Sequence, residues 1–493
     1  MGSLARLRSL GPRRWQRLSQ PWKRLFPALP QGRDWIQALV FWGLGLLAVW
    51  PLWTVQRPPL QDLPQHLAAI RVLHDYTDPF YGFQRYFELS FSHTQYLTVY
   101  LAGDWLAHVF DVELATRVLI SAAVMALPLA VRWLLRVLER DEWLALLVFP
   151  LSYNAHLMLG FLNFTAALPW VFWGLGLAIR QRVSPRPRRA WLLGAVVLIT
   201  FFTHVVPCAF LAAGVFLVGL RKGLRTSLRD WSVLVPTALA SIWWVLRTPA
   251  GHALAAAAGG QVVSRDTRPQ FQPWSTTLRE LPGWLTDVLR GPVDEQLLIL
   301  WGLLMLGTVC LGETTRGSPQ ASANRPFLLT SLRQRLGLLP VLAGLAGFVT
   351  PVSYDWIWPI NARFPLLTAL LVVPVLPVSV HWLRYAVRGC AVVISVLSFA
   401  LVAAAFQRFE RDEVGALDQA LLAIPPGQRV AGLIFQRSSR EVKFSPFLHS
   451  AAWAQVRRGG GRDVHVRRFS PLALPIPRRQ SSTAGPSSLG MDA

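Results

Sequence analysis

The sequence predicts an all-α membrane protein with about eleven transmembrane helices and a small α/β appendage at its carboxyl end. Of its 493 residues, 53% are hydrophobic, only 15% are charged and 22 are tryptophan. Apolar stretches long enough to cross a bilayer recur along most of the chain. Short arginine-rich segments separate these stretches, which is the pattern of cytoplasmic loops in multispan membrane proteins.

The net charge is explained by this topology. A formal charge of +23 would indicate nucleic acid in a soluble protein. Here the arginines cluster between apolar runs, so we expect no nucleic-acid partner. Arginine greatly outnumbers lysine, and alanine, leucine and glycine are abundant, a composition typical of GC-rich bacterial genomes. Cys208, Cys310 and Cys390 all lie in apolar runs, so no disulfide framework is indicated.

The amino-terminal part sets the orientation. Residues 1–35 are rich in arginine and are expected in the cytoplasm. The apolar stretch 36–55 is too long, and its basic flank too extended, for a cleaved signal peptide, so it is expected to remain as the first helix. Residues 56–93 then form a polar extracytoplasmic loop.

The next stretch allows two interpretations. Residues 96–110 are apolar but short, and they carry Asp104 and His108. If this stretch crossed the membrane, the arginine-rich segment 180–189 would lie outside. If it is a helix on the membrane surface, that segment lies inside. We expect a surface helix.

The remaining helices complete a transmembrane domain over residues 36–406. Further spans are expected near 114–135, 143–158, 164–180, 190–203, 205–220, 231–248, 295–312, 336–350, 365–384 and 390–406. Several are too short to cross about 30 Å upright. The sequence "FFTHVVPCAF" (201–210) predicts a tight helical hairpin, a feature tolerated where it is buried in protein or lines a cavity.

The chain changes character after residue 406. Residues 407–470 are expected to form a small α/β extracytoplasmic domain, with a strand at "RVAGLIF" (429–435) and a helix within 446–461 that the following glycines end. The Pro/Ser-rich residues 471–493 are expected to be disordered. The carboxyl end is thus expected outside, opposite to residues 1–35.

Asp62 and His66 are the first candidate site residues. A spacing of four places them on one face of a helix that leaves the membrane. In one interpretation Asp62 is only a helix N-cap, and Gln65 completes a capping box. In the other, Asp62 is a general base or charge stabiliser, and His66 orients substrate or binds a metal.

Other ionisable residues lie at the same predicted level. His93, His156, His204 and Arg363 each fall at the outer end of a span. Such groups are costly at membrane depth and therefore indicate function, although each alone also fits a snorkelling or hydrogen-bonded residue. Arg363, in "YDWIWPINARFPLL" (354–367), can grip a phosphate with two nitrogens at the depth of lipid headgroups.

The order of these parts resembles the GT-C superfamily of membrane glycosyltransferases, which includes aminoarabinose transferases and protein O-mannosyltransferases. The resemblance covers the layout of residues 36–406. Asp62 stands where that family keeps its catalytic aspartate, and His93 near the position of a lysine in aminoarabinose-type members. "FFTHVVP" (201–207) resembles the family's hairpin turn. Arg363 in "ARFPLLTALLVVP" (362–374) resembles the arginine that meets the donor phosphate.

This resemblance implies a hexosyl- or pentosyltransferase in a bacterial inner membrane. Its donor would be a polyprenyl-phosphate-linked sugar, its acceptor a lipid, glycan or protein, and its surroundings membrane lipids. Asp62 would be catalytic, and His66, His93, His204 and Arg363 would bind substrate. There is no second acidic residue beside Asp62, so a divalent cation such as Mg²⁺ or Mn²⁺ stays open. The alternatives are a transporter or flippase for lipid-linked envelope precursors and a non-catalytic membrane scaffold.

Overall fold

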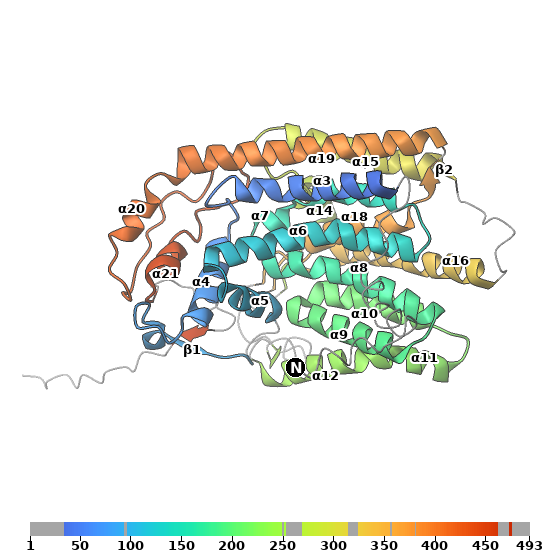
Figure 1. Cartoon of the computed structure of the whole chain (residues 1–493), viewed down its shortest axis with the longest axis horizontal. Coiled ribbons are helices and arrows are strands. Elements are labelled where there is room, and N and C mark those ends of the chain that lie inside the picture. The colour runs from blue at the N-terminus through green and yellow to red at the C-terminus, as the bar shows by residue number, and fades with distance from the viewer. Residues whose placement is uncertain are drawn as a thin grey trace, which may run out of the picture.

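The helices of the protein lie side by side in one elongated bundle (Figure 1). The computed structural model describes residues 34–92, 96–248, 251–252, 269–313, 324–354, 357–379, 381–461 and 473–475. In this part, six helices are long and apolar enough to cross a membrane: Trp35–Trp53, Val112–Val137, Leu162–Val183, Val293–Leu311, Leu328–Val349 and Arg384–Val414. Length and composition thus define a polytopic α-helical membrane protein. The count of about eleven spans includes shorter helices and stays a prediction.

The longer elements have the following bounds in chain order. They are α3 (Asp34–Trp53), α4 (Leu63–His74), α5 (Thr98–Ala107), α6 (Val112–Val137), η2 (Glu142–Leu151), α7 (Ala155–Met158), α8 (Leu162–Val183), α9 (Pro187–Thr203), α10 (Val205–Gly219), α11 (Leu224–Trp231), α12 (Val235–Arg247), α14 (Trp274–Trp284), α15 (Val293–Leu311), α16 (Asn324–Leu336), α17 (Leu338–Val349), α18 (Arg363–Val372), α19 (His381–Phe409), α20 (Leu417–Leu422) and α21 (Ala452–Arg458).

Large apolar side chains cover the outward faces of the bundle. Leu39 and Leu46 on α3 are each 63% exposed, and Leu303 on α15 is 59% exposed. A soluble protein rarely shows such extended apolar faces, whereas lipid chains would cover them. The inward faces close a core in which α8 packs against α6 and α10. This arrangement fits helices that pack on protein on one side and on lipid on the other.

The hairpin predicted over residues 201–210 is present. Helix α9 ends at Thr203 and α10 begins at Val205, so that only His204 connects them. His204 has an extended backbone, and its Nδ1 accepts a hydrogen bond from the amide of Val206 at 3.1 Å. This histidine caps α10, because the ring nitrogen satisfies an amide that has no partner within the helix.

Two predicted spans are not continuous helices. The segment 143–158 is a ten-residue 3₁₀ helix, η2, followed by the single turn of α7. The segment 365–384 stops early, because α18 gives way to a short 3₁₀ turn at Val373–Val375 before α19 starts. Prolines lie inside or just after each interrupted stretch, at positions 150 and 374, and a proline removes the amide that an α-helix needs.

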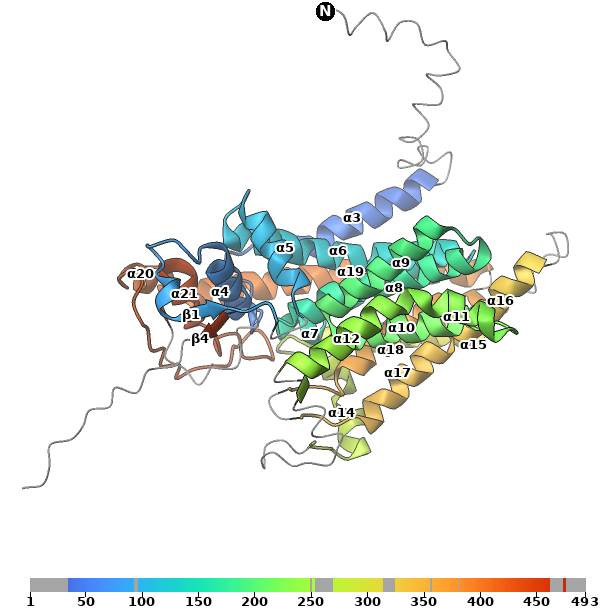
Figure 2. The same cartoon turned by 90° about the horizontal axis from the view of Figure 1, so that it is seen from below.

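One end of the bundle holds the polar connections. Helices α4, α5, α20 and α21 gather there (Figures 1 and 2). Helix α5 has ten residues, about 15 Å in length, so it is too short to cross a bilayer and fits a surface helix. Helix α21 packs on α4. The carboxyl-terminal segment therefore returns to the loop that follows the first helix.

A short sheet joins the same two regions. Strand β4 (Ala473–Pro475) pairs antiparallel with β1 (Phe87–Leu89) of the 56–93 loop. Residues 473–475 belong to the tail that the sequence predicts to be disordered. Residues 429–435, predicted as a strand, are irregular apart from a single bridge residue. The described part of 407–470 thus shows the end of α19, a π-helical turn at Glu410–Val414 and the short helices α20 and α21, and an α/β domain there stays a prediction.

Arginine side chains gather at the opposite end of the bundle. Arg333 on α16 donates to the carbonyl of Leu138 at the end of α6, at 3.1 Å. Near the start of α19, Arg388 pairs with Asp141 at 2.9 Å. Arg335 donates to the carbonyl of Leu217 on α10 at 3.2 Å. Basic residues that are distant in sequence therefore meet at one end, away from α4.

Candidate functional site

The site begins where the chain leaves α3 and enters α4. The amide of Gln61 donates to the carbonyl of Met158 at 2.9 Å, and that of Asp62 donates to the carbonyl of Leu159 at 3.1 Å. Next to them, Gly160 has a φ of +80°, which a glycine adopts without strain. A Cβ on Gly160 would lie 2.7 Å from the backbone nitrogen of Asp62. Two backbone segments thus touch directly, and this contact fixes the position of Asp62.

The side chain of Asp62 is not a helix cap. Asp62 occupies the N-cap position of α4, but its carboxylate makes no capping hydrogen bond. Gln65, the proposed capping-box partner, instead contacts His449, with 2.6 Å between its Nε2 and the ring Nδ1. The capping box is therefore not formed, and the carboxylate is free for another contact.

That contact is with His449, close to α21. Its Nε2 lies 3.3 Å from Oδ1 of Asp62, an ion-pair distance. Because Nδ1 accepts a hydrogen bond from the amide of Gln65, the neutral ring carries its proton on Nε2, facing the carboxylate. Oδ1 is buried and has no aligned hydrogen bond within the described residues. A carboxylate oxygen in this state can accept a proton from a bound group.

His66 lies one turn from Asp62 but bonds elsewhere. Its Nδ1 lies 2.9 Å from the hydroxyl of Tyr100 on α5, and the carbonyl of Gly160 accepts a second hydrogen bond from the ring. Burial lowers the pKa of His66, which the nearby Asp62 charge opposes. The ring is therefore a neutral link between α4, α5 and the turn before α8. With both nitrogens occupied, it does not hold Asp62 directly.

Arg363 is a buried cation at the start of α18. It is 9% exposed, and its guanidinium carbon lies 5.6 Å from the centre of the Phe161 ring. Its Nε has no hydrogen-bond partner among the described residues, and none of their ion pairs includes it. An arginine without a carboxylate partner is costly to bury. Its guanidinium group can therefore bind an anion.

Two tyrosines lie between the carboxylate and the cation. Burial raises the pKa of Tyr100, and the negative charge of Asp62 adds to this rise. Burial also raises the pKa of Tyr96, and the positive charge of Arg363 opposes it. Both phenols therefore stay protonated and can donate hydrogen bonds. They connect the surroundings of Asp62 with those of Arg363.

Two further histidines line the Arg363 side. The ring of His204 stacks on Tyr96, with 5.1 Å between centres. His156 lies on α7, and its Nε2 donates to the carbonyl of Ala362 at 3.0 Å. His204 lies close enough to Arg363 for the two to interact electrostatically. His93, the remaining candidate, lies outside the described residues.

Sequence reasoning missed His449, Tyr96 and Tyr100. His449 is distant in sequence from Asp62 and belongs to a segment read only as an appendage. Both tyrosines lie in the surface-helix stretch 96–110, where attention went to Asp104 and His108. Tyr100 lies on α5 and Tyr96 just before it, and two tyrosines four positions apart in a predicted surface helix were the available signal.

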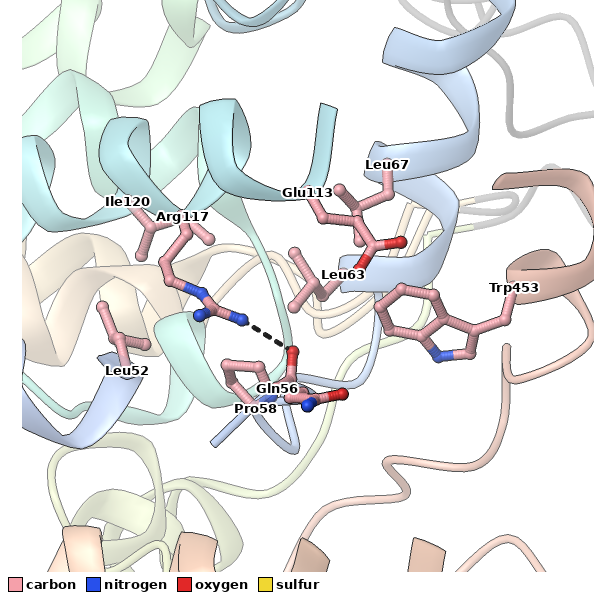
Figure 3. Close-up of a pocket in the computed structure, with 9 residues that line it drawn as sticks. All are labelled: Leu52, Gln56, Pro58, Leu63, Leu67, Glu113, Arg117, Ile120 and Trp453. Atoms are coloured by element: carbon pink, nitrogen blue, oxygen red, sulfur yellow. Dashed lines mark hydrogen bonds between the residues drawn. The ribbon is translucent and has the colours of Figure 1, made fainter. Parts of the chain in front are cut away.

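A pocket lies beside this cluster, on an adjacent face of α4 (Figure 3). Its lining is mostly apolar and consists of Leu52, Gln56, Pro58, Leu63, Leu67, Glu113, Arg117, Ile120 and Trp453. Arg117 donates to the carbonyl of Gln56 at 2.8 Å, as the dashed line shows. Neither Asp62 nor Arg363 lines this pocket.

Comparison with known proteins does not assign the chain to a family, so its class of protein is defined here by its fold and its candidate site. No protein-family model matches the chain. No curated protein matches it either. The residues themselves define a polytopic helical membrane protein with a carboxylate, a buried guanidinium and several histidines and tyrosines at one end of its bundle.

Proposed function

We propose that the protein is a membrane glycosyltransferase that takes a sugar from a polyprenyl-phosphate donor. One observation carries this proposal. Asp62, with a buried oxygen that lacks an aligned hydrogen bond, lies at the same end of the bundle as Arg363, a buried cation without a carboxylate partner in the described chain. Tyr100, which is hydrogen-bonded to His66, lies near Asp62, and Tyr96 lies near Arg363.

Glycosyl transfer needs opposite charges on the two sides of one carbon. The hydroxyl oxygen of the acceptor attacks the anomeric carbon, and the bond from that carbon to the phosphate oxygen breaks. A base takes the hydroxyl proton, and positive charge stabilises the departing phosphate. Asp62 is assigned as the base and Arg363 as the group that binds the phosphate.

The neighbouring residues support these two roles. His449 faces Asp62 with its Nε2, so it can orient the carboxylate and stabilise its charge before transfer. Tyr96 and His204 form a stacked pair near Arg363 that can bind the donor. His66 positions Tyr100 rather than touching substrate. A divalent cation at Asp62 stays open, because a single carboxylate is a weak site for Mg²⁺ or Mn²⁺.

The distribution of arginines supports a location for the site. Arg333, Arg335 and Arg388 lie at the end of the bundle away from Asp62. Arginines also lie near Asp62, but Arg57, Arg71 and Arg457 there pair with carboxylates. The positive-inside rule favours the cytoplasm for the end that holds the arginine-rich connections between apolar helices. The site would then face outward from a bacterial inner membrane, where polyprenyl-linked sugars and their acceptors are available. The carboxyl-terminal segment, which contacts α4, would lie on the same outer side.

The rival function is transport or flipping of a lipid-linked envelope precursor. A transporter is expected to bind its substrate near the middle of the membrane, between repeated halves. Here the candidate groups lie at one end, and no repeat is visible in the sequence. A scaffold without catalysis would have no use for a buried Arg363 that has no carboxylate partner among the described residues.

The test is transfer by an Asp62→Asn variant in a strain of the source organism that lacks the gene. This change keeps the shape of the side chain and removes the base, so transfer should fall by about 10²–10⁴-fold while folding is retained. Lipid-linked saccharides and glycan products are profiled by mass spectrometry. The missing sugar in the deletion strain would identify donor and acceptor together.

Asp78→Asn is the matched control for this experiment. Asp78 lies in the same loop, is exposed, and accepts a hydrogen bond from the amide of Phe80 at 2.8 Å, which an asparagine oxygen can also accept. The Asp78→Asn control should restore the wild-type saccharide profile in the deletion strain. If Asp62→Asn restores the wild-type profile at matched expression, the carboxylate is not the base and the proposed mechanism is wrong.

A further inference from the structure

A second polar cluster lies at the far end of α4, away from Asp62. It consists of His74, the last residue of α4, with Asp104 on α5 and His108 at its end. One ligand atom from each of the three lies within 4.8 Å of the other two. Nδ1 of His74 donates to Oδ1 of Asp104 at 2.9 Å, and the rings of His74 and His108 are 4.8 Å apart.

The close approach of the two helices brings these residues together. A Cβ on Gly103 would lie 2.6 Å from Cδ1 of Ile70, so the glycine lets α5 pack close to α4 without a shift of this side chain. His74 follows Ile70 by one turn, and Asp104 follows Gly103 directly. His108 lies one further turn along α5, on the same face as Asp104. The cluster is therefore a consequence of the helix contact.

The orientation of His108 is that of a metal-binding histidine. Its Nδ1 donates to the backbone carbonyl of Asp104 at 2.9 Å. Such a hydrogen bond fixes the ring and leaves the Nε2 lone pair free, as is usual in histidines that bind metals. His108 is exposed, and the side chains of His74 and Asp104 are 19% and 26% exposed. An ion from solution can reach all three.

We propose that His74, Asp104 and His108 bind one divalent transition-metal ion of the zinc class. Two imidazoles and one carboxylate form a ligand set that suits Zn²⁺ and related ions, with water as a further ligand, whereas Mg²⁺ and Ca²⁺ prefer oxygen ligands alone. On binding, the ion replaces the hydrogen bond between His74 and Asp104, and the neutral ring binds it through the nitrogen that carries no proton.

The site has a structural role. His74 lies twelve residues after Asp62, about 18 Å along the helix, so the ion does not take part in chemistry at Asp62. It joins the end of α4 to the end of α5. The other end of this helix pair is joined by His66 and Tyr100. With the metal bound, the surface helix would be held against α4 at both ends, by the ion at one and by His66 and Tyr100 at the other.

The experiment is metal titration of the purified full chain in detergent micelles. The affinity tag must contain no histidine, and bound metal is first removed with a chelator. Zn²⁺ is then titrated in competition with a chromophoric chelator, and Co²⁺ is added separately to read its visible absorption. We expect one equivalent of Zn²⁺, unaffected by excess Mg²⁺, and a Co²⁺ spectrum of a site containing nitrogen ligands.

Matched variants assign the ligands. His108→Gln should lower the Zn²⁺ affinity by about tenfold or more and remove the Co²⁺ spectrum. Asp104→Asn should do the same. His252→Gln is the control, because His252 is also exposed and also bonded to a backbone carbonyl, that of Leu246 at 2.8 Å. It should bind like the wild type.

Two results would overturn the proposal. One is the absence of stoichiometric Zn²⁺ binding to the wild type. The other is equal affinity in His108→Gln and His252→Gln. Asp104→Asn also removes the ion pair with His74 and can weaken folding, so the exposed His108 variant decides the outcome.

Discussion

Replacing Gly160 by alanine tests whether backbone contact positions the carboxylate of Asp62. The new Cβ would lie 2.7 Å from the backbone nitrogen of Asp62 and 3.0 Å from its Cα, whereas ordinary contact begins near 3.4 Å. One segment must therefore move by about 0.7 Å. A displacement of about 1 Å can reduce a reaction about 10²-fold, so we expect a loss of transfer between roughly tenfold and 10²-fold.

The same substitution also has a conformational cost. Gly160 has a φ of +80°, and an L-residue in this left-handed region costs about 1–2 kcal/mol. Gly415→Ala separates the two effects. Gly415 has a φ of +58°, but nothing lies within 4 Å of its Cβ position. The control therefore carries the conformational cost without the displacement of Asp62.

The assay combines transfer with stability. Each variant is expressed in the deletion strain, its protein level is matched, and the lipid-linked saccharide profile is measured. Thermal unfolding of the purified variants in detergent micelles gives the stability change. Gly160→Ala should lose transfer, whereas Gly415→Ala, which has a backbone cost but no contact with Asp62, should keep transfer. Equal transfer by the two variants would refute the idea that this backbone contact positions Asp62.

Three further predictions concern the side chains of the site. Arg363→Leu removes a buried cation that has no carboxylate partner among the described residues. The variant should therefore unfold at an equal or higher temperature than the wild type, while the saccharide profile shows that transfer is lost. A clearly lower unfolding temperature would contradict this. His449→Gln should reduce transfer about tenfold or more, but it should cause no further loss in the Asp62→Asn variant, because His449 acts through Asp62. Additive losses would show that His449 does not act through Asp62. Burial lowers the pKa of His66, so folding favours its neutral form, and the associated stability is present above about pH 6.5 and lost below it. The Tm of the wild type should therefore fall more than that of His66→Asn on acidification, and parallel pH profiles would refute this.

The sequence predicts those parts of the fold that depend on local pattern. Apolar stretches indicate the long helices α6, α8 and α15, and the polar break at His204 indicates the hairpin between α9 and α10. The prediction of continuous helices from the sequence is wrong where prolines interrupt apolar stretches. The composition of 143–158 is as apolar as that of a transmembrane helix, but η2 is a ten-residue 3₁₀ helix. An apolar composition indicates that a segment is buried, but it does not indicate whether the segment forms an α-helix or a 3₁₀ helix.

In the candidate site too, local sequence patterns identify some residues, whereas contacts between distant residues are not predicted. Asp62 and Arg363 are found from sequence because an ionisable residue beside an apolar stretch is conspicuous. The contact between Gln65 and His449 joins residues 384 positions apart, and no local pattern indicates such a pairing. The capping-box interpretation failed for this reason, since Gln65 had a better partner in the tertiary structure. The role of a polar side chain depends on contacts that only the folded chain supplies.

The direction of two helices limits the topology further. At the end of α3, the amide of Gln56 donates to the carboxylate of Glu410, just after α19, at 2.7 Å. Near the start of α19, Arg388 pairs with Asp141, just beyond the far end of α6. Helices α3 and α19 therefore run in the same direction.

Two parallel helices in one bundle require an odd total of crossings from the first to the last, because each crossing reverses the chain. Eleven spans satisfy this condition, and ten or twelve do not. The parallel direction of α3 and α19 is consistent with the predicted count of eleven spans. If the arginine-rich end is cytoplasmic, then Asp62, Arg363 and His449 all face outward, and the carboxyl-terminal segment that supplies His449 completes the site from that side.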